Sequence, residues 1–71
     1  VDVDAQLQVL ARNVRALREQ RGESQEEAAK GAGLHRTYLN RVERGHVNVT
    51  VGTLVRLAAH YGVRPGELFD N

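Results

Sequence analysis

Apolar residues recur at intervals of three and four through the first part of the chain. They are Leu7, Leu10, Val14 and Leu17. This spacing is the period of one helical face, and Gly22 follows the run at a position suited to a positive φ. The pattern therefore predicts a helix over about residues 5–21.

The next segment opens on a helix-capping pattern. Ser24 is followed three residues later by Glu27, so the hydroxyl can accept a hydrogen bond from the first turn while the carboxylate accepts one from the Ser24 N–H. A second helix is expected to start there. It should be short, because Gly31 lowers helix stability by roughly 1 kcal/mol relative to alanine and Gly33 can adopt the left-handed conformation that ends a helix.

Segment 35–44 is amphipathic when its residues are projected at about 100° each. One side is mostly apolar and consists of His35, Tyr38, Leu39 and Val42. The other side consists of Arg36, Thr37, Asn40, Arg41 and Arg44. Every residue of this second side can hydrogen-bond to a base or a phosphate. We expect a helix held by its narrow apolar seam, with the guanidinium groups facing outward.

A further helix is expected after Thr50, whose hydroxyl can cap it, and should end at Gly62. The stripe predicted to be buried consists of Val51, Leu54, Val55, Ala58 and Tyr61. Arg64-Pro65 then restarts the chain, since proline fits a first helical position, and "PGELF" should form a last short turn. No stretch has the alternation and β-branched density of a strand, so the predicted fold class is all-α.

Length and composition narrow the possible classes of protein. The 71 residues indicate one domain, 1–71. The absence of Cys excludes a disulfide framework and a thiolate nucleophile. No apolar run approaches the roughly 20 residues of a membrane span, and the acidic start lacks the basic residues of a signal peptide. We expect a soluble cytoplasmic protein that does not bind a membrane.

Catalytic, cofactor and metal sites are not expected. His35, His46 and His60 share no metal-ligand spacing, and the "GAG" at 31–33 follows no predicted strand, as a phosphate-binding fingerprint would. Ser24 is the only serine and serves best as a helix cap. Without a recognisable setting for a nucleophile, base and orienting acid, the sequence does not predict an enzyme.

Residues about 24–44 have the spacing of a helix-turn-helix. Ala29 is small where the two helices would cross, Gly33 can make the turn, and Leu39 and Val42 can anchor the second helix. A close crossing of this kind lets the second helix project into a major groove about 12 Å wide.

The segment "SQEEAAKGAGLHRTYLNRVERG" resembles the helix-turn-helix of the phage repressor and Cro (XRE-like) family, and the resemblance continues through "NVTVGTLVRLAAHYGVRPGELF". Within that family, "HRTYL…ERG…N" is most similar to the small controller proteins of restriction-modification systems. The resemblance implies a compact five-helix, lambda-repressor-like domain, with helices in 50–69 for the core and dimerisation. It also implies a sequence-specific transcription regulator of the repressor or controller type, encoded by a prokaryote or a phage. This regulator would act on double-stranded DNA at the nucleoid, in the cytoplasm.

The resemblance also implies roles for individual residues. The base-reading residues would be Arg36, Thr37, Tyr38, Asn40 and Arg41. The phosphate-binding residues would be Gln25, His35, Arg44, His46 and Asn48. Arg18 and Glu43 would form a structural salt bridge between the first helix and the recognition helix. Ala28, Gly31 and His35 depart from the family pattern, which has a larger apolar residue, a helix former and a better capping residue at these places.

One helix-turn-helix contacts only about four or five base pairs, so a homodimer on a palindromic operator is expected. Its interface is predicted on the last helix and its approach, at Tyr61, Val63, Leu68 and Phe69. A controller protein would also contact RNA polymerase at some sites. The alternative is a protein-interaction module, such as an antitoxin-like partner, that uses the same helices to cover another protein.

Overall fold

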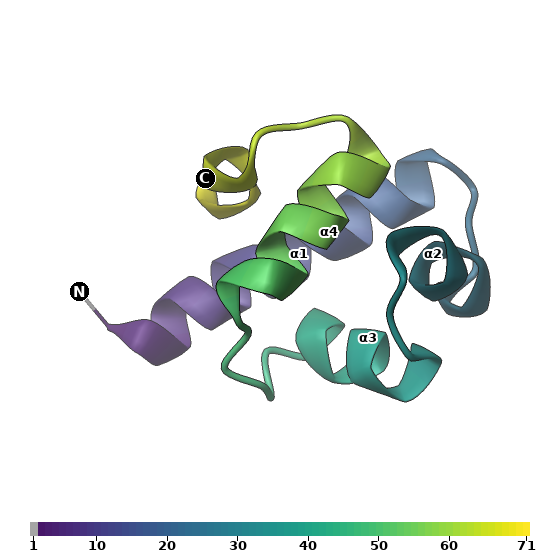
Figure 1. The fold of residues 1–71 in the computed structure, drawn as a ribbon. Helices are drawn as coiled ribbons and strands as arrows, with labels where there is room; N and C mark the ends of the chain where they lie inside the picture. Colours follow the sequence, from purple (N-terminus) through teal and green to yellow (C-terminus); the bar gives the residue numbers. More distant parts are fainter. Residues whose placement is uncertain (1) are drawn as a thin grey trace.

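The computed structural model describes residues 2–71 and is helical throughout its regular elements. The elements are α1 (Val3–Gln20), α2 (Gln25–Ala32), α3 (Arg36–Glu43), α4 (Val51–Tyr61) and the 3-10 helix η1 (Pro65–Phe69). Figure 1 shows α4 in front of α1, α3 at the bottom and α2 at the right. The all-α prediction is confirmed over the described residues. Of the five helices expected, four are α-helices, and the last short turn predicted at "PGELF" is a five-residue 3-10 helix that begins at Pro65.

Local capping sets most helix ends where the sequence predicts them. Ser24 Oγ accepts from the Glu27 N–H at 3.0 Å, and Glu27 Oε1 accepts from the Ser24 N–H at 2.9 Å. Thr50 caps α4 in the same way, and Gly33 and Gly62 end α2 and α4 with φ of 72° and 67°. The first helix begins earlier than predicted, at Val3, because Asp2 accepts from the Asp4 N–H. The hydrophobic period alone does not register that polar cap.

The core lies where α1, α3, α4 and η1 meet, with α2 packed against α3 and α4. Its largest fully buried side chains are Leu10, Val14, Leu39, Val42, Leu57 and Leu68. Alanines on α2, at positions 28, 29 and 32, complete the core on that side. These small side chains allow α2 to approach its neighbours closely.

The inward face of α4 differs from the predicted stripe. Val51 is 75% exposed and Val55 50% exposed, whereas Thr53 and Leu57 are buried together with Ala58 and Tyr61. The prediction assigned Val51 and Val55 to the core because they are apolar. The inward arc includes Thr53 instead, whose hydroxyl bonds to Thr50 Oγ1 and Tyr38 Oη. A polar residue with local partners can therefore occupy the buried face.

Candidate nucleic-acid interface

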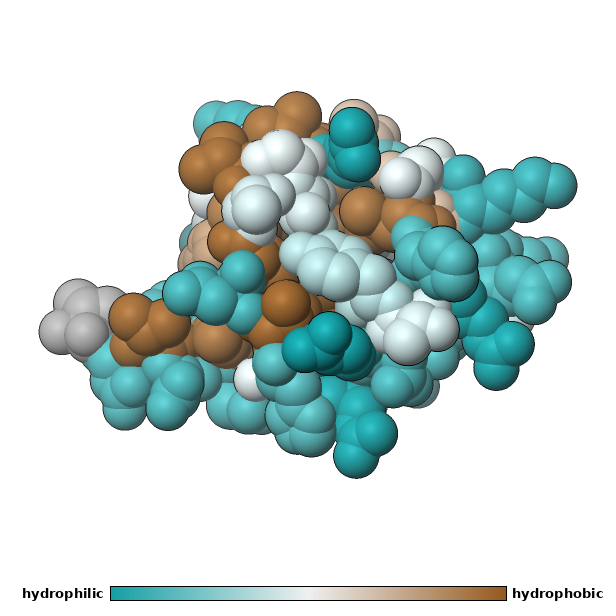
Figure 2. Space-filling model, turned by 60° about the horizontal axis from the view of Figure 1, so that its bottom comes forward, coloured by the Kyte–Doolittle hydropathy of each residue, from teal (hydrophilic) through white to brown (hydrophobic). Residues whose placement is uncertain are grey.

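Helix α3 presents a polar face at the edge of the molecule. Its inward side chains, Leu39 and Val42, are buried in the core. Arg36, Thr37 and Arg41 are exposed on the outward side. In Figure 2 the lower side of Figure 1, where α3 lies, is turned toward the viewer. Hydrophilic surface covers the lower and right margins of this view. The helix is therefore fixed on one side and free to meet a ligand on the other.

The turn between α2 and α3 is tight and closed by backbone hydrogen bonds. Gly33 has a left-handed φ of 72°, and the Leu34 N–H donates to the Ala29 carbonyl at 2.8 Å. Ala29 itself is buried at the crossing. His35 precedes α3 as its N-cap residue but makes no side-chain capping bond, so its exposed ring is free for other contacts.

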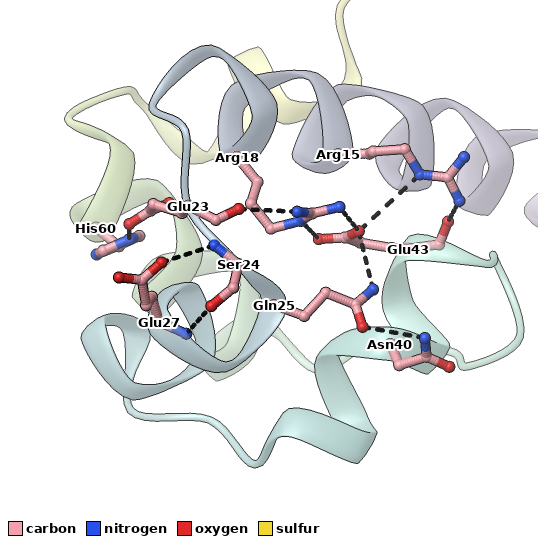
Figure 3. A network of polar contacts seen from close by, with 9 residues as sticks. All are labelled: Arg15, Arg18, Glu23, Ser24, Gln25, Glu27, Asn40, Glu43 and His60. Carbon is pink, nitrogen blue, oxygen red and sulfur yellow. Dashed lines mark hydrogen bonds and ion pairs between the residues drawn. The ribbon is translucent and has the colours of Figure 1, made fainter.

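A buried carboxylate ties α3 to α1. Glu43 accepts from Arg18 Nε at 2.8 Å and from Arg18 Nη2 at 3.0 Å, and its side chain is fully buried. This bidentate hydrogen bonding raises the pKa of Arg18. The other terminal nitrogen of Arg18 donates to the Glu23 carbonyl, as Figure 3 shows. The pair fixes α3 against α1 and against the loop before α2.

The amide of Gln25 links the buried Glu43 carboxylate to the side chain of Asn40. Gln25 Nε2 donates to Glu43 Oε1 at 3.2 Å, and Gln25 Oε1 accepts from Asn40 Nδ2 at 3.2 Å. A surface hollow lies beside this link and is lined by Gln25, His35, Arg36, Thr37 and Asn40. The structure thus brings together two predicted phosphate-binding residues and three predicted base-reading residues. The sequence analysis missed the Gln25–Asn40 contact, since no motif marks a contact between separate helices.

Other predicted site residues lie around this hollow. Tyr38 is half-buried, and its hydroxyl lies 3.3 Å from Thr53 Oγ1, so part of the side chain packs against α4. Arg44, His46 and Asn48 are exposed in and after the C-cap of α3. The predicted phosphate-binding residues therefore form two groups, one before α3 and one after it. Arg15, which was not predicted, donates to the Glu43 carbonyl at 3.0 Å beside the second group.

The charge at the start of α3 is partly balanced. Arg36 Nη1 lies 3.8 Å from Glu26 Oε2, and both side chains are largely exposed. An exposed ion pair of this kind is weak, about 0–1 kcal/mol. Arg36 can therefore leave Glu26 for a stronger partner at little cost.

The predicted dimer residues separate into two classes. Leu68 is fully buried and Tyr61 is 5% exposed, so neither side chain is available on the surface of a single copy. Both fill the core of the same chain, because η1 folds back onto α1 and α4. Val63 and Phe69 are half-buried against that core. The large apolar side chains with most exposure are instead Val3, Val51 and Val55.

No helix in residues 2–71 combines the length and apolar character needed to cross a membrane. Within the same range, no three His, Cys, Asp or Glu side chains gather closely enough to hold a metal ion.

The sequence of this chain is similar to those of known proteins. A family described as helix-turn-helix matches residues 14–68. Control protein C.SmaI of Serratia marcescens is 51% identical over 51 residues, which are 72% of this chain and 61% of that protein. A Neisseria hypothetical transcription factor, from Neisseria meningitidis serogroup B, is 43% identical over 60 residues, or 84% of this chain and 57% of that protein. The chain therefore spans about three fifths of the length of these curated relatives.

Solved structures extend the likeness to the fold. The crystal structure of the restriction-modification controller protein C.AhdI from Aeromonas hydrophila has a TM-score of 0.86 at 40% identity, covering 92% of this chain and 98% of that one. The crystal structure of the Neisseria transcription factor NHTF has a TM-score of 0.88 at 38% identity, covering 99% of this chain and 80% of that one.

Proposed function

Because this chain belongs to the helix-turn-helix family, we propose that it is a sequence-specific, DNA-binding transcription regulator of the controller type, with α3 entering the major groove of double-stranded DNA. The observation that carries the proposal is the pairing of a buried seam, Leu39 and Val42, with an exposed guanidinium face on the same helix. Such a helix can be inserted into a groove without disturbing the core.

The outward residues of α3 suit base edges. Arg36 and Arg41 can each bind the O6 and N7 acceptors of a guanine, and the Thr37 methyl suits the methyl group of thymine. Tyr38 contributes the part of its ring that remains exposed. Asn40 faces the same hollow as Arg36 and Thr37. These residues would set the sequence preference.

The two groups of phosphate-binding residues flank α3. Gln25 keeps one amide hydrogen beyond the one given to Glu43, and it lies at the start of α2, where the helix dipole favours an anion. His35 lies beside it. Arg44, His46 and Asn48 would bind the backbone at the other end of α3. Contacts on both sides fix the register of the helix in the groove.

Two copies would bind a palindromic operator, with recognition helices about 34 Å apart. The dimer surface that we propose includes Val51 and Val55, which are exposed on α4, together with Val63 and Phe69, which are half-buried. At some operators the bound dimer would contact RNA polymerase, and at others it would block it. This activity needs no cofactor and places the protein at the nucleoid.

The test is selection of bound duplexes from a random pool, followed by binding measurements on variants. A palindromic consensus is expected. Arg36→Ala and Arg41→Ala should reduce the preference for the selected sequence, whereas Arg44→Ala, which removes a proposed phosphate contact, should weaken binding to all sequences alike. Equal losses on selected and random duplexes for both arginine variants would contradict base reading.

Salt dependence tests the alternative of a protein-interaction module. Binding to DNA through several phosphates must fall steeply as a power of salt concentration. An apolar protein interface responds little to salt. A chain that binds no duplex at low salt would reject the DNA-binding proposal and favour the alternative.

A further inference from the structure

We propose that buried Glu43, acting through Gln25, fixes the amide of Asn40 with its carbonyl oxygen toward the groove, so that Asn40 selects a base carrying an exocyclic amino group. The inference rests on the proposed function and adds to it the chemical class of one base in the operator. It depends on the direction of each hydrogen bond in the chain Glu43–Gln25–Asn40, which Figure 3 shows.

Glu43 determines the first step, because its carboxylate can only accept hydrogen bonds. Its side chain is fully buried and both oxygens receive hydrogen bonds from Arg18. A carboxylate in this setting offers no donor to its third partner, Gln25. Gln25 must therefore turn its NH2 group toward Glu43, as the 3.2 Å contact from Nε2 to Oε1 records.

The second step follows from the geometry of the amide. With the Gln25 NH2 group toward Glu43, the carbonyl oxygen faces the opposite way and meets Asn40. A carbonyl oxygen can only accept, so Asn40 must present its own NH2 group there. The reversed Asn40 amide would place two carbonyl oxygens against each other and leave Gln25 Oε1 without its donor, at a cost comparable to a lost hydrogen bond.

The third step concerns what remains free on Asn40. Its carbonyl oxygen lies on the side away from Gln25 (Figure 3), and the residue lines the hollow shared with Arg36 and Thr37. In the major groove, adenine and cytosine present amino donors, whereas guanine and thymine present acceptors. The oriented oxygen attracts the amino groups of adenine and cytosine and repels the acceptor atoms of guanine and thymine. Adenine fits best, because its N7 can also accept the remaining Asn40 N–H.

In this arrangement Gln25 and Glu43 are positioning residues. Neither needs to touch the base, and each acts by removing one orientation of the next amide. The distinctive consequence is a change in base preference at a single position when the link is cut, apart from any general loss of affinity.

The experiment begins with the selected wild-type duplex and Asn40→Ala. The position at which Asn40→Ala loses its preference identifies the contacted base, which should be adenine or cytosine. Replacing that base by its analogue without the exocyclic amino group should weaken wild-type binding about tenfold, within the range of a good base contact. The same replacement should leave binding by Asn40→Ala unchanged. A wild-type protein that is indifferent to the amino group at every position would overturn the proposal.

Gln25→Met tests the positioning step. Methionine keeps the length of the side chain but neither donates nor accepts strongly, so Asn40 becomes free to rotate. The preference for an amino-bearing base at the Asn40 position should fall to near that of Asn40→Ala, in addition to a general loss of affinity. Asn48→Ala is the control, because it removes a proposed phosphate contact that takes no part in this link, and it should preserve the preference. Thermal melting checks that each variant is folded.

The outcomes distinguish this inference from the proposed function. If the wild-type protein selects no sequence, both are wrong. If it selects a consensus that depends on Arg36 and Arg41 while Gln25→Met preserves the preference at the Asn40 position, then only the positioning of Asn40 is wrong.

Discussion

The effect of Gly31 on the stability of the domain depends on its surroundings. Considered alone, it weakens α2 by roughly 1 kcal/mol relative to alanine. In the structure a Cβ at this position would overlap the ring of His60 from α4. That ring is mostly buried, and its Nε2 lies 2.7 Å from Glu23 Oε2. The glycine thus makes room for a contact between α4 and the loop before α2.

We expect Gly31→Ala to have opposite effects in two backgrounds. In the wild-type chain it should lower the free energy of unfolding by about 1 kcal/mol, since losing the hydrogen bond to the Glu23 carboxylate costs about 2 kcal/mol and the gain in helix propensity offsets only about 1 kcal/mol of that. In a His60→Ala background the same change should raise it by up to about 1 kcal/mol, because only helix propensity remains. Urea unfolding of the four proteins gives the coupling energy. An equal effect in both backgrounds would show that the ring does not depend on the glycine.

At the scale of the element, α2 depends on its reciprocal cap. The helix has only eight residues, and isolated helices of that length are unstable in water. Hydrogen bonds from Ser24 lower the pKa of the Glu27 carboxyl. Because the folded value lies below the unfolded one, Glu27 contributes stability above its unfolded pKa of about 4.3 and loses it as the pH falls through the folded value.

Glu27→Gln should therefore change the acid sensitivity of the domain. Glutamine can still accept from the Ser24 N–H but does not titrate, so the variant lacks this contribution to the pH dependence. We expect the stability of the wild-type protein relative to the variant to decline as the pH falls below about 4.3. Urea midpoints at neutral and acidic pH measure this difference. Parallel pH curves for the two proteins would assign the acid sensitivity to other carboxylates.

At the scale of the whole molecule, the proposed dimer requires a surface on which two copies can meet. Tyr61 and Leu68 are buried in the core, whereas Val51 and Val55 are largely exposed on α4. Exposed apolar surface of this kind favours association. Two-fold binding would place the same α4 face of each copy at the axis, with α3 of each copy directed toward the DNA.

Val55→Glu should produce a monomer that remains folded, because a half-exposed side chain contributes little to the core while a charge at the two-fold axis repels its copy. Its affinity for a duplex with two half-sites should fall about 100-fold, since the two sites are no longer linked. Sedimentation and duplex binding measure the two effects. Lys30→Glu on the exposed side of α2 is the charge-changing control and should stay dimeric. A dimeric Val55→Glu protein would place the interface elsewhere.

The sequence by itself determined the features that depend on neighbours in the chain. Hydrophobic period, the caps at Ser24 and Thr50, and the glycines that end α2 and α4 are local, so they predicted the four α-helices and the outward guanidinium face of α3. Local patterns also limited the prediction. They did not reveal that Asp2 starts α1 early, and they predicted "PGELF" as a short turn without identifying it as a 3-10 helix.

Only the tertiary structure decided which surfaces become interior and which polar groups meet. Thr53 replaced Val51 and Val55 on the inward face of α4, and η1 drew Leu68 into the core. Gly31 met His60, and Gln25 joined Glu43 to Asn40. Each of these contacts connects residues that are distant in sequence, and their energies depend on the packing of several helices at once. No pattern within one helix contains that information.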